Sequence, residues 1–198
     1  LREGAESVVP STINALISSL IDRLPASARE LLADAAVLGK QFPLAHLRAL
    51  TSGDRFEGDL SQIERRGFLD RQAGGPVATL AFRHVLSQEV AYGALLQSDR
   101  QTRHRRAAEM LERLYRGRTE EVGDQLAHHW AQSDRRMQAL PYLLATADGA
   151  VAVGANQEAI GYLQTALGLV TEHPTATKNE ADAIRLKLAG LHFIVGER

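Results

Sequence analysis

One stretch decides the fold of this chain: Phe68-Leu69-Asp70-Arg71-Gln72-Ala73-Gly74-Gly75-Pro76-Val77-Ala78-Thr79-Leu80-Ala81-Phe82. Two short segments, 68–72 and 77–82, flank Ala73-Gly74-Gly75-Pro76, which is the strongest turn signal in the sequence. This arrangement predicts a β-hairpin. A hairpin of this length is marginal in water, so we expect it to pack against helices.

Apolar residues on both sides of the hairpin recur at intervals of three and four, which is the period of an amphipathic helix. Before the hairpin, the pattern predicts four helices, and after it a fifth over about 85–95. Helices that surround a single hairpin are typical of a winged helix. We therefore place a winged-helix domain at residues 10–97.

The helical period continues to the end of the chain, over about 98–116, 122–130, 140–153, 155–170 and 180–195. Ala147, Ala159, Leu163 and Ala166 occupy the small-small-large-small positions of a tetratricopeptide repeat. The last helix resembles the first half of another repeat that is cut at Arg198. We expect a helical linker and tetratricopeptide-like antiparallel repeats over 98–198, truncated at the C-terminus, and a mainly α fold class.

Composition excludes several functions. The 198 residues are 44% hydrophobic and 24% charged, with a formal net charge of −1 and no cysteine. A near-neutral chain has no general attraction for nucleic acid, and a chain without cysteine has no thiol chemistry. No apolar run approaches the length of a membrane span, and the start at Leu1 lacks an initiator Met. We expect a cytoplasmic, excised part of a larger protein that contacts no membrane.

The sequence contains no recognisable catalytic motif. A phosphate-binding loop, a Gly-x-Ser-x-Gly elbow and a His-Glu-x-x-His helix are all absent. His128 and His129 are adjacent, so on a helix they point about 100° apart and are not expected to hold one metal ion. We predict that His129 packs beside Trp130, that His128 faces solvent, and that this fragment has no catalytic residue, no metal site and no enzymatic activity.

A basic run lies in the helix over 98–116 and includes Arg100, Arg103, His104, Arg105 and Arg106. Acidic residues are interleaved with it, which favours a solvated, salt-bridged face over a nucleic-acid site. The segment 55–66, where a winged helix would read DNA, carries three arginines and three acidic residues. Nucleic acid is therefore not an expected partner.

His84 is the main candidate for a binding role, because it follows the second predicted strand and opens a helix. A histidine at such a junction can donate to a phosphate, helped by the N-terminus of the helix. The alternative is a histidine that only caps the helix or packs locally, and the residues themselves leave both open.

Several segments occur in a recognisable order: Val9-Pro10-Ser11-Thr12-Ile13, Ile21-Asp22-Arg23-Leu24-Pro25, Ala35-Ala36-Val37-Leu38-Gly39-Lys40-Gln41-Phe42-Pro43, Arg66-Gly67-Phe68-Leu69, Phe82-Arg83-His84-Val85-Leu86-Ser87-Gln88-Glu89-Val90-Ala91-Tyr92 and Leu126-Ala127-His128-His129-Trp130. This order resembles the region that follows the ATPase core in bacterial STAND-type signalling ATPases. It is most similar to those fused behind class III adenylate/guanylate cyclase domains. Large ATP-dependent transcription regulators share much of it.

The resemblance implies a non-catalytic regulatory region of a multidomain, nucleotide-dependent signalling protein, with an adenylate/guanylate cyclase as the expected effector. The winged helix would pack on the P-loop ATPase domain of the same chain and help to switch it. The repeats would sense a signal or bind a protein or peptide. ATP or ADP would be the cofactor of the parent, and His84 would contact the β-phosphate of ADP.

Two alternatives remain at this point. The chain could be the winged-helix DNA-binding or regulatory part of a large ATP-dependent transcription regulator. It could also be a free-standing tetratricopeptide-like scaffold, although the winged-helix half argues against that reading.

Overall fold

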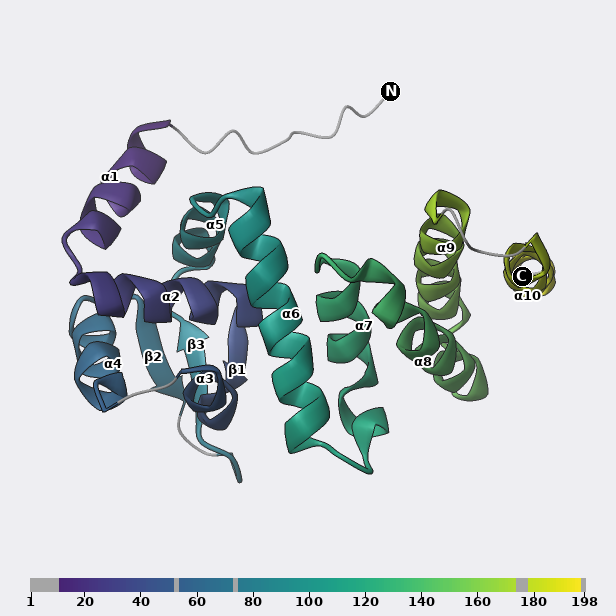
Figure 1. Cartoon of the computed structure of the whole chain (residues 1–198), viewed down its shortest axis with the longest axis horizontal. Coiled ribbons are helices and arrows are strands. Elements are labelled where there is room, and N and C mark those ends of the chain that lie inside the picture. The colour runs from purple at the N-terminus through teal and green to yellow at the C-terminus, as the bar shows by residue number, and fades with distance from the viewer. Residues whose placement is uncertain (1–10, 52–53, 73–74, 174–177, 197–198) are drawn as a thin grey trace. The chain divides into compact units, whose positions relative to one another are not determined.

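The computed structural model describes residues 11–51, 54–72, 75–173 and 178–196. Within these residues the chain is mainly helical and has a small three-stranded antiparallel sheet, which confirms the expected mainly α fold class. The chain divides into two compact units, Leu1–Gln97 and Ser98–Arg198, whose elements are labelled in Figure 1.

The first unit is organised around its second helix, which contacts three other helices of the unit. Pro25 precedes this helix at φ −55°, and its ring presets the dihedral that a first turn requires. The buried face includes Leu31, Leu32 and Ala35, all at most 3% exposed. The elements of the unit are α1 (Ser11–Asp22), α2 (Ala26–Leu38), β1 (Gln41–Pro43), α3 (Leu44–Leu50), α4 (Phe56–Arg65), β2 (Leu69–Gln72), β3 (Thr79–Phe82) and α5 (Val85–Gly93).

The sheet of the first unit has the strand order β1-β3-β2, so the central strand is β3. In the hairpin, Leu69 pairs with Phe82 and Gln72 with Thr79. The predicted hairpin is present, although β3 begins at Thr79 rather than at Val77. Residues 73 and 74 of the predicted turn lie outside the described residues.

The expectation of a single hairpin was incomplete, because β1 adds a third strand that pairs with β3. This strand has only three residues and ends in Pro43, which is too short to show an alternating pattern in the sequence. Phe42 is nevertheless buried and opposes Leu80 of the central strand. Burial of this one aromatic side chain, rather than periodicity, fixes the strand.

The second unit is a succession of helices in which α7, α8, α9 and α10 each contact the next one along the chain. Gly154 has φ +78°, a conformation that suits glycine, and it ends the turn between α8 and α9. The elements are α6 (Gln97–Leu114), a 3₁₀ helix (Thr119–Val122), α7 (Gly123–Ala131), a second 3₁₀ helix (Arg136–Ala139), α8 (Leu140–Ala152), α9 (Asn156–Glu172) and α10 (Lys178–Gly196).

Small side chains are buried on α8 and α9, two helices that contact each other. Ala147, Ala159 and Ala166 are at most 1% exposed, and the larger Leu163 is buried beside them. Alanine has no atoms beyond Cβ, so two helices can approach closely where alanines face each other. The burial of these four side chains follows the small-small-large-small pattern of the sequence.

Helix α10 is buried on one face only. Ala181, Ile184, Leu188 and Leu191 are buried, and α10 contacts α9. On the remaining surface of the helix, Leu186 is 76% exposed and Phe193 is 67% exposed. The helix therefore presents large apolar side chains to solvent in this chain.

The packing of α8 against α9 predicts the effect of enlarging Ala159. Replacing this fully buried alanine by leucine (Ala159→Leu) should overpack the contact and lower the free energy of unfolding by about 1–3 kcal/mol. Chemical denaturation measures the loss. The matched control is Ala152→Leu at the exposed end of α8, which should change stability little. Equal midpoints for the two variants would contradict the packing described here.

Candidate functional site

His84 lies at the junction that the sequence predicts, directly before α5. Its backbone is extended (φ −128°, ψ 127°), and its carbonyl accepts the backbone N–H of Ser87 at 2.9 Å, which starts the helix. The side chain makes no capping hydrogen bond, and the residue is exposed. The ring of His84 is thus accessible to a ligand at the N-terminus of α5.

The neighbours of His84 hold the backbone in place. The guanidinium of Arg83 donates two hydrogen bonds to the carboxylate of Asp70, at 2.6 and 2.8 Å. Gly67, at φ +77°, leaves room for this pair, because a Cβ there would lie 2.9 Å from Nη1 of Arg83. The side-chain amide of Gln88 donates to the carbonyl of Ala36 at 2.8 Å and joins α5 to α2.

The electrostatics at this junction follow from the same ion pair. The hydrogen bond from Arg83 lowers the pKa of Asp70, and the charge of His84 contributes in the same direction. The pair is exposed, so its attraction is screened by water and contributes little to stability. Its role is geometric, since it fixes the strand ends next to His84.

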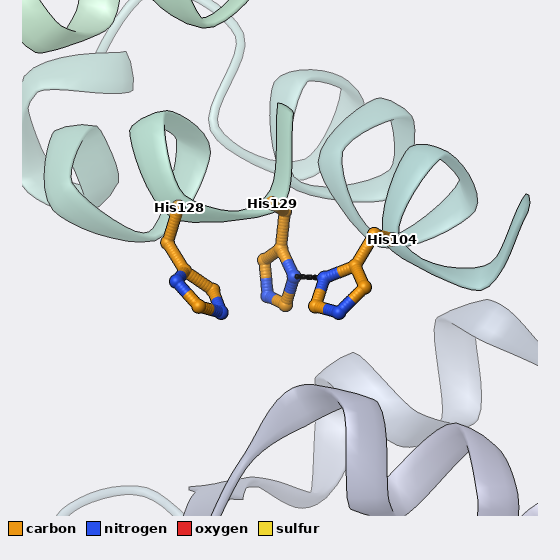
Figure 2. Close-up of side chains that lie close together, drawn as sticks. All are labelled: His104, His128 and His129. Carbon is orange, nitrogen blue, oxygen red and sulfur yellow. Dashed lines mark hydrogen bonds between the residues drawn. The ribbon is translucent and has the colours of Figure 1, made fainter. Parts of the chain in front are cut away.

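A second constellation joins His104 of α6 to His128 and His129 of α7 (Figure 2). The ring centroids of His128 and His129 lie 5.3 Å apart, and the ring of His104 lies 5.5 and 5.1 Å from them. One ring nitrogen of each residue lies within 4.8 Å of the other two. His104 and His129 are buried, and His128 is exposed, as predicted.

The expectation that adjacency keeps His128 and His129 out of one site was therefore wrong in its geometry. The angle of about 100° refers to the Cα–Cβ directions, and the side chains rotate beyond Cβ so that their rings converge. The third member comes from another helix, which an argument from spacing within one helix does not detect.

A hydrogen bond connects the two buried rings. Nδ1 of His104 and Nδ1 of His129 are 2.9 Å apart. One of the two atoms must carry a proton and the other must accept it, so two neutral imidazoles of opposite tautomer satisfy the contact. A second proton between them would replace attraction by repulsion.

Burial favours the neutral forms. Burial above all, then the charges of His128 and Arg100, lowers the pKa of His104 to about 4. Although His128 as a residue is exposed, its ring is partly shielded from water, and this desolvation lowers its pKa, an effect that Asp124 opposes. At neutral pH these rings therefore carry lone pairs rather than positive charges.

Glu112 lies two helical turns after His104 on the same side of α6. One of its carboxylate oxygens accepts the indole N–H of Trp130 at 2.9 Å and the hydroxyl of Tyr142 at 2.8 Å. Burial and the neighbouring carboxylate raise the pKa of Tyr142 to about 12. A single carboxylate thus connects α6 to both α7 and α8.

A cavity of about 580 Å³ opens next to this contact, lined by the first 3₁₀ helix, α7, α8 and α9. Its walls include Tyr142 and Tyr162 and the acidic residues Glu120, Asp124 and Glu158. Burial first, and then the charges of Asp124 and Glu158, raises the pKa of Tyr162. Among the residues that the structure describes, no arginine, lysine or histidine lines this cavity.

The basic run of α6 is at least partly neutralised. Arg105 forms an ion pair with Asp134 at 2.9 Å, in line with the salt-bridged face that the sequence suggests.

Among the described residues, no helix has both the length and the hydrophobicity that a bilayer crossing requires.

The chain is similar to part of a longer protein. It is 31% identical over 188 residues to an uncharacterised protein of Rhizobium meliloti (strain 1021). The match covers 92% of this chain but only 18% of that relative. No family model and no solved structure matches the chain.

The buried histidine pair predicts a loss of stability in acid. In the unfolded chain His104 has a pKa near 6.5, whereas in the folded chain its pKa is about 4. The unfolded state therefore binds more protons between these pH values, and the stability falls as the pH is lowered through that window. The loss from this residue is on the order of 3 kcal/mol at pH 4 and levels off at lower pH, below both pKa values.

Urea unfolding of the chelator-treated chain at several pH values between 7 and 4 measures this effect. The variant His104→Gln should lose stability less steeply with falling pH than the wild type. The control His192→Gln, at an exposed position of α10, should keep the wild-type slope. A wild-type slope in His104→Gln would show that His104 is not the group that titrates.

Proposed function

We propose that this chain is a non-catalytic regulatory and interaction region of a larger, nucleotide-dependent signalling protein. The switch of that protein would be a P-loop ATPase domain of the same chain that binds ATP or ADP. Its effector would be an adenylate/guanylate cyclase domain, in a cytoplasmic protein. The motif order of the sequence supports this proposal, as does the match to less than a fifth of a longer relative.

For the first unit we propose a winged helix. The order α2-β1-α3-α4-β2-β3, with β1 and β2 on either side of β3, supports this arrangement, and the β2–β3 hairpin would be the wing. Helix α4 would then be the element that reads DNA in a DNA-binding member. Its acidic residues Glu57 and Glu64 form ion pairs with Arg71, and Glu57 also pairs with Arg48.

These ion pairs favour a protein-facing role over DNA binding. A helix that reads DNA needs uncompensated positive charge near the phosphates. The acidic side chains of α4 instead occupy the nearby arginines, so the alternative of a DNA-binding transcription regulator has less support. The ATPase domain is the partner that we propose for this unit.

For the second unit we propose tetratricopeptide-like repeats that bind a basic segment of a protein partner. The acidic cavity supports this, because three carboxylates and two tyrosines are available there to a lysine or arginine side chain. Tyrosine offers a large rigid contact area as well as a hydroxyl, which suits recognition of a peptide.

The observation that carries the switch proposal is the exposed ring of His84 at the start of α5. Arg83 and Gln88 make contacts that hold the local structure, and His84 is an exposed histidine between them. An imidazole at a helix N-terminus can donate a hydrogen bond to a phosphate group. We propose that it contacts a phosphate of ADP bound to the ATPase domain and so stabilises the resting state.

The test is His84→Ala in the full-length protein. A charge-assisted hydrogen bond contributes about 1.5–3 kcal/mol, so its loss should weaken ADP binding about ten- to a hundredfold and raise basal output. The matched control is His192→Ala, which removes another exposed histidine and should leave both quantities unchanged. If ADP affinity and basal output of His84→Ala equal those of the wild type in a folded protein, His84 is not the switch contact.

A further inference from the structure

The three histidines of α6 and α7 form a nitrogen-only set of possible ligands within one unit of the chain. One ring nitrogen of each residue lies within 4.8 Å of the other two, and the closest pair is 2.9 Å apart. The rings of His128, His129 and His104 extend to the same side of the two helices (Figure 2). Convergent imidazoles of this kind are the ligands that divalent transition metals prefer, whereas Mg²⁺ and Ca²⁺ prefer oxygen.

The spacing is close to what a metal ion needs. Two imidazole nitrogens bound to one tetrahedral Zn²⁺ at 2.0–2.1 Å lie about 3.3 Å apart. The Nδ1 atoms of His104 and His129 would have to separate by about 0.4 Å from their present 2.9 Å. His128 is exposed, so its ring can rotate to complete the set without disturbing buried side chains.

The protonation of the set also fits. The hydrogen-bonded pair keeps one proton between two Nδ1 atoms, and a metal ion at that position would take its place. The displaced proton moves to Nε2 of the same ring, so each imidazole stays neutral and binds through Nδ1.

The nearby charges act in opposite directions. Asp124 lies one turn before His128 on α7 and favours a cation, while Arg100 lies one turn before His104 on α6 and opposes it. Both side chains are partly or fully exposed, so water weakens their effects on the set. Neither charge therefore prevents a cation from binding to the three imidazoles.

We propose that His104, His128 and His129 bind one Zn²⁺ ion, with water in the remaining coordination position, and that the ion holds α6 against α7. The site is separate from the nucleotide contact proposed for His84. Three protein ligands and one open position make this an exchangeable site rather than a closed structural one. Zinc binding would then stabilise the pairing of α6 with α7.

The experiment uses the whole chain without an affinity tag, treated with chelator and then titrated with ZnCl₂ at pH 7. Calorimetry should give one Zn²⁺ per chain with a Kd on the order of 1 μM or tighter. The thermal midpoint should rise with Zn²⁺ concentration, because an ion that binds only the folded state stabilises it. MgCl₂ should give neither signal.

Matched variants decide whether the three histidines are responsible. His128→Gln removes the exposed ligand and should weaken Zn²⁺ binding at least tenfold while the chain stays folded. His192→Gln makes the same substitution on the exposed surface of α10 and should bind as the wild type does. His104→Gln should also abolish the Zn²⁺-dependent rise in midpoint, but His128→Gln decides the matter if that variant fails to fold.

Two results would overturn the proposal. One is that the wild type does not bind Zn²⁺ one-to-one, or that it binds the ion only at millimolar concentrations. The other is equal Zn²⁺ affinity for His128→Gln and the wild type, which would assign the ion to other side chains.

Discussion

The second unit depends on how α6 is held against α7. The two buried rings of His104 and His129 meet at 2.9 Å, and this contact requires that they share a single proton. Ala107 and Ala108 are fully buried on the same helix. Two turns after His104, Glu112 accepts hydrogen bonds from Trp130 and Tyr142 and extends the connection to α8. Tyr142 in turn lines the acidic cavity, so the polar contacts of α6 also set one wall of the surface proposed for a partner.

In the first unit, some side chains hold the local structure, and a different side chain stays exposed for the proposed contact. Arg83 and Gln88 are tied to Asp70 and to the backbone of Ala36, and between them the ring of His84 remains exposed. A hydrogen-bonded frame beside one exposed polar side chain suits a contact that forms and breaks with nucleotide state. The histidine set of the second unit differs, because two of its members are themselves buried.

Local periodicity predicted most of the helices and the hairpin, because amphipathic patterns depend on residues near each other in the chain. It missed β1, where burial of Phe42 against the central strand decides the conformation of three residues. It also missed that His104 lies beside His128 and His129, because these two residues follow His104 by 24 and 25 positions in the sequence. One signal was available: His104 lies on the same helical face as Ala107, Ala108 and Leu111, which marks it as a buried histidine in need of a partner. The acidic cavity had no such signal, because four elements build it together.

The central requirement is that His104 and His129 form a neutral pair of opposite tautomers. Long-range proton–nitrogen NMR spectra of the metal-free chain at pH 7 measure the tautomer of each ring directly. One ring should be protonated at Nδ1 and the other at Nε2, and His104 should stay neutral at pH values where exposed histidines are already charged. A His104 ring that titrates near pH 6.5 like an exposed histidine would contradict the buried pair and the arrangement of α6 and α7 that rests on it.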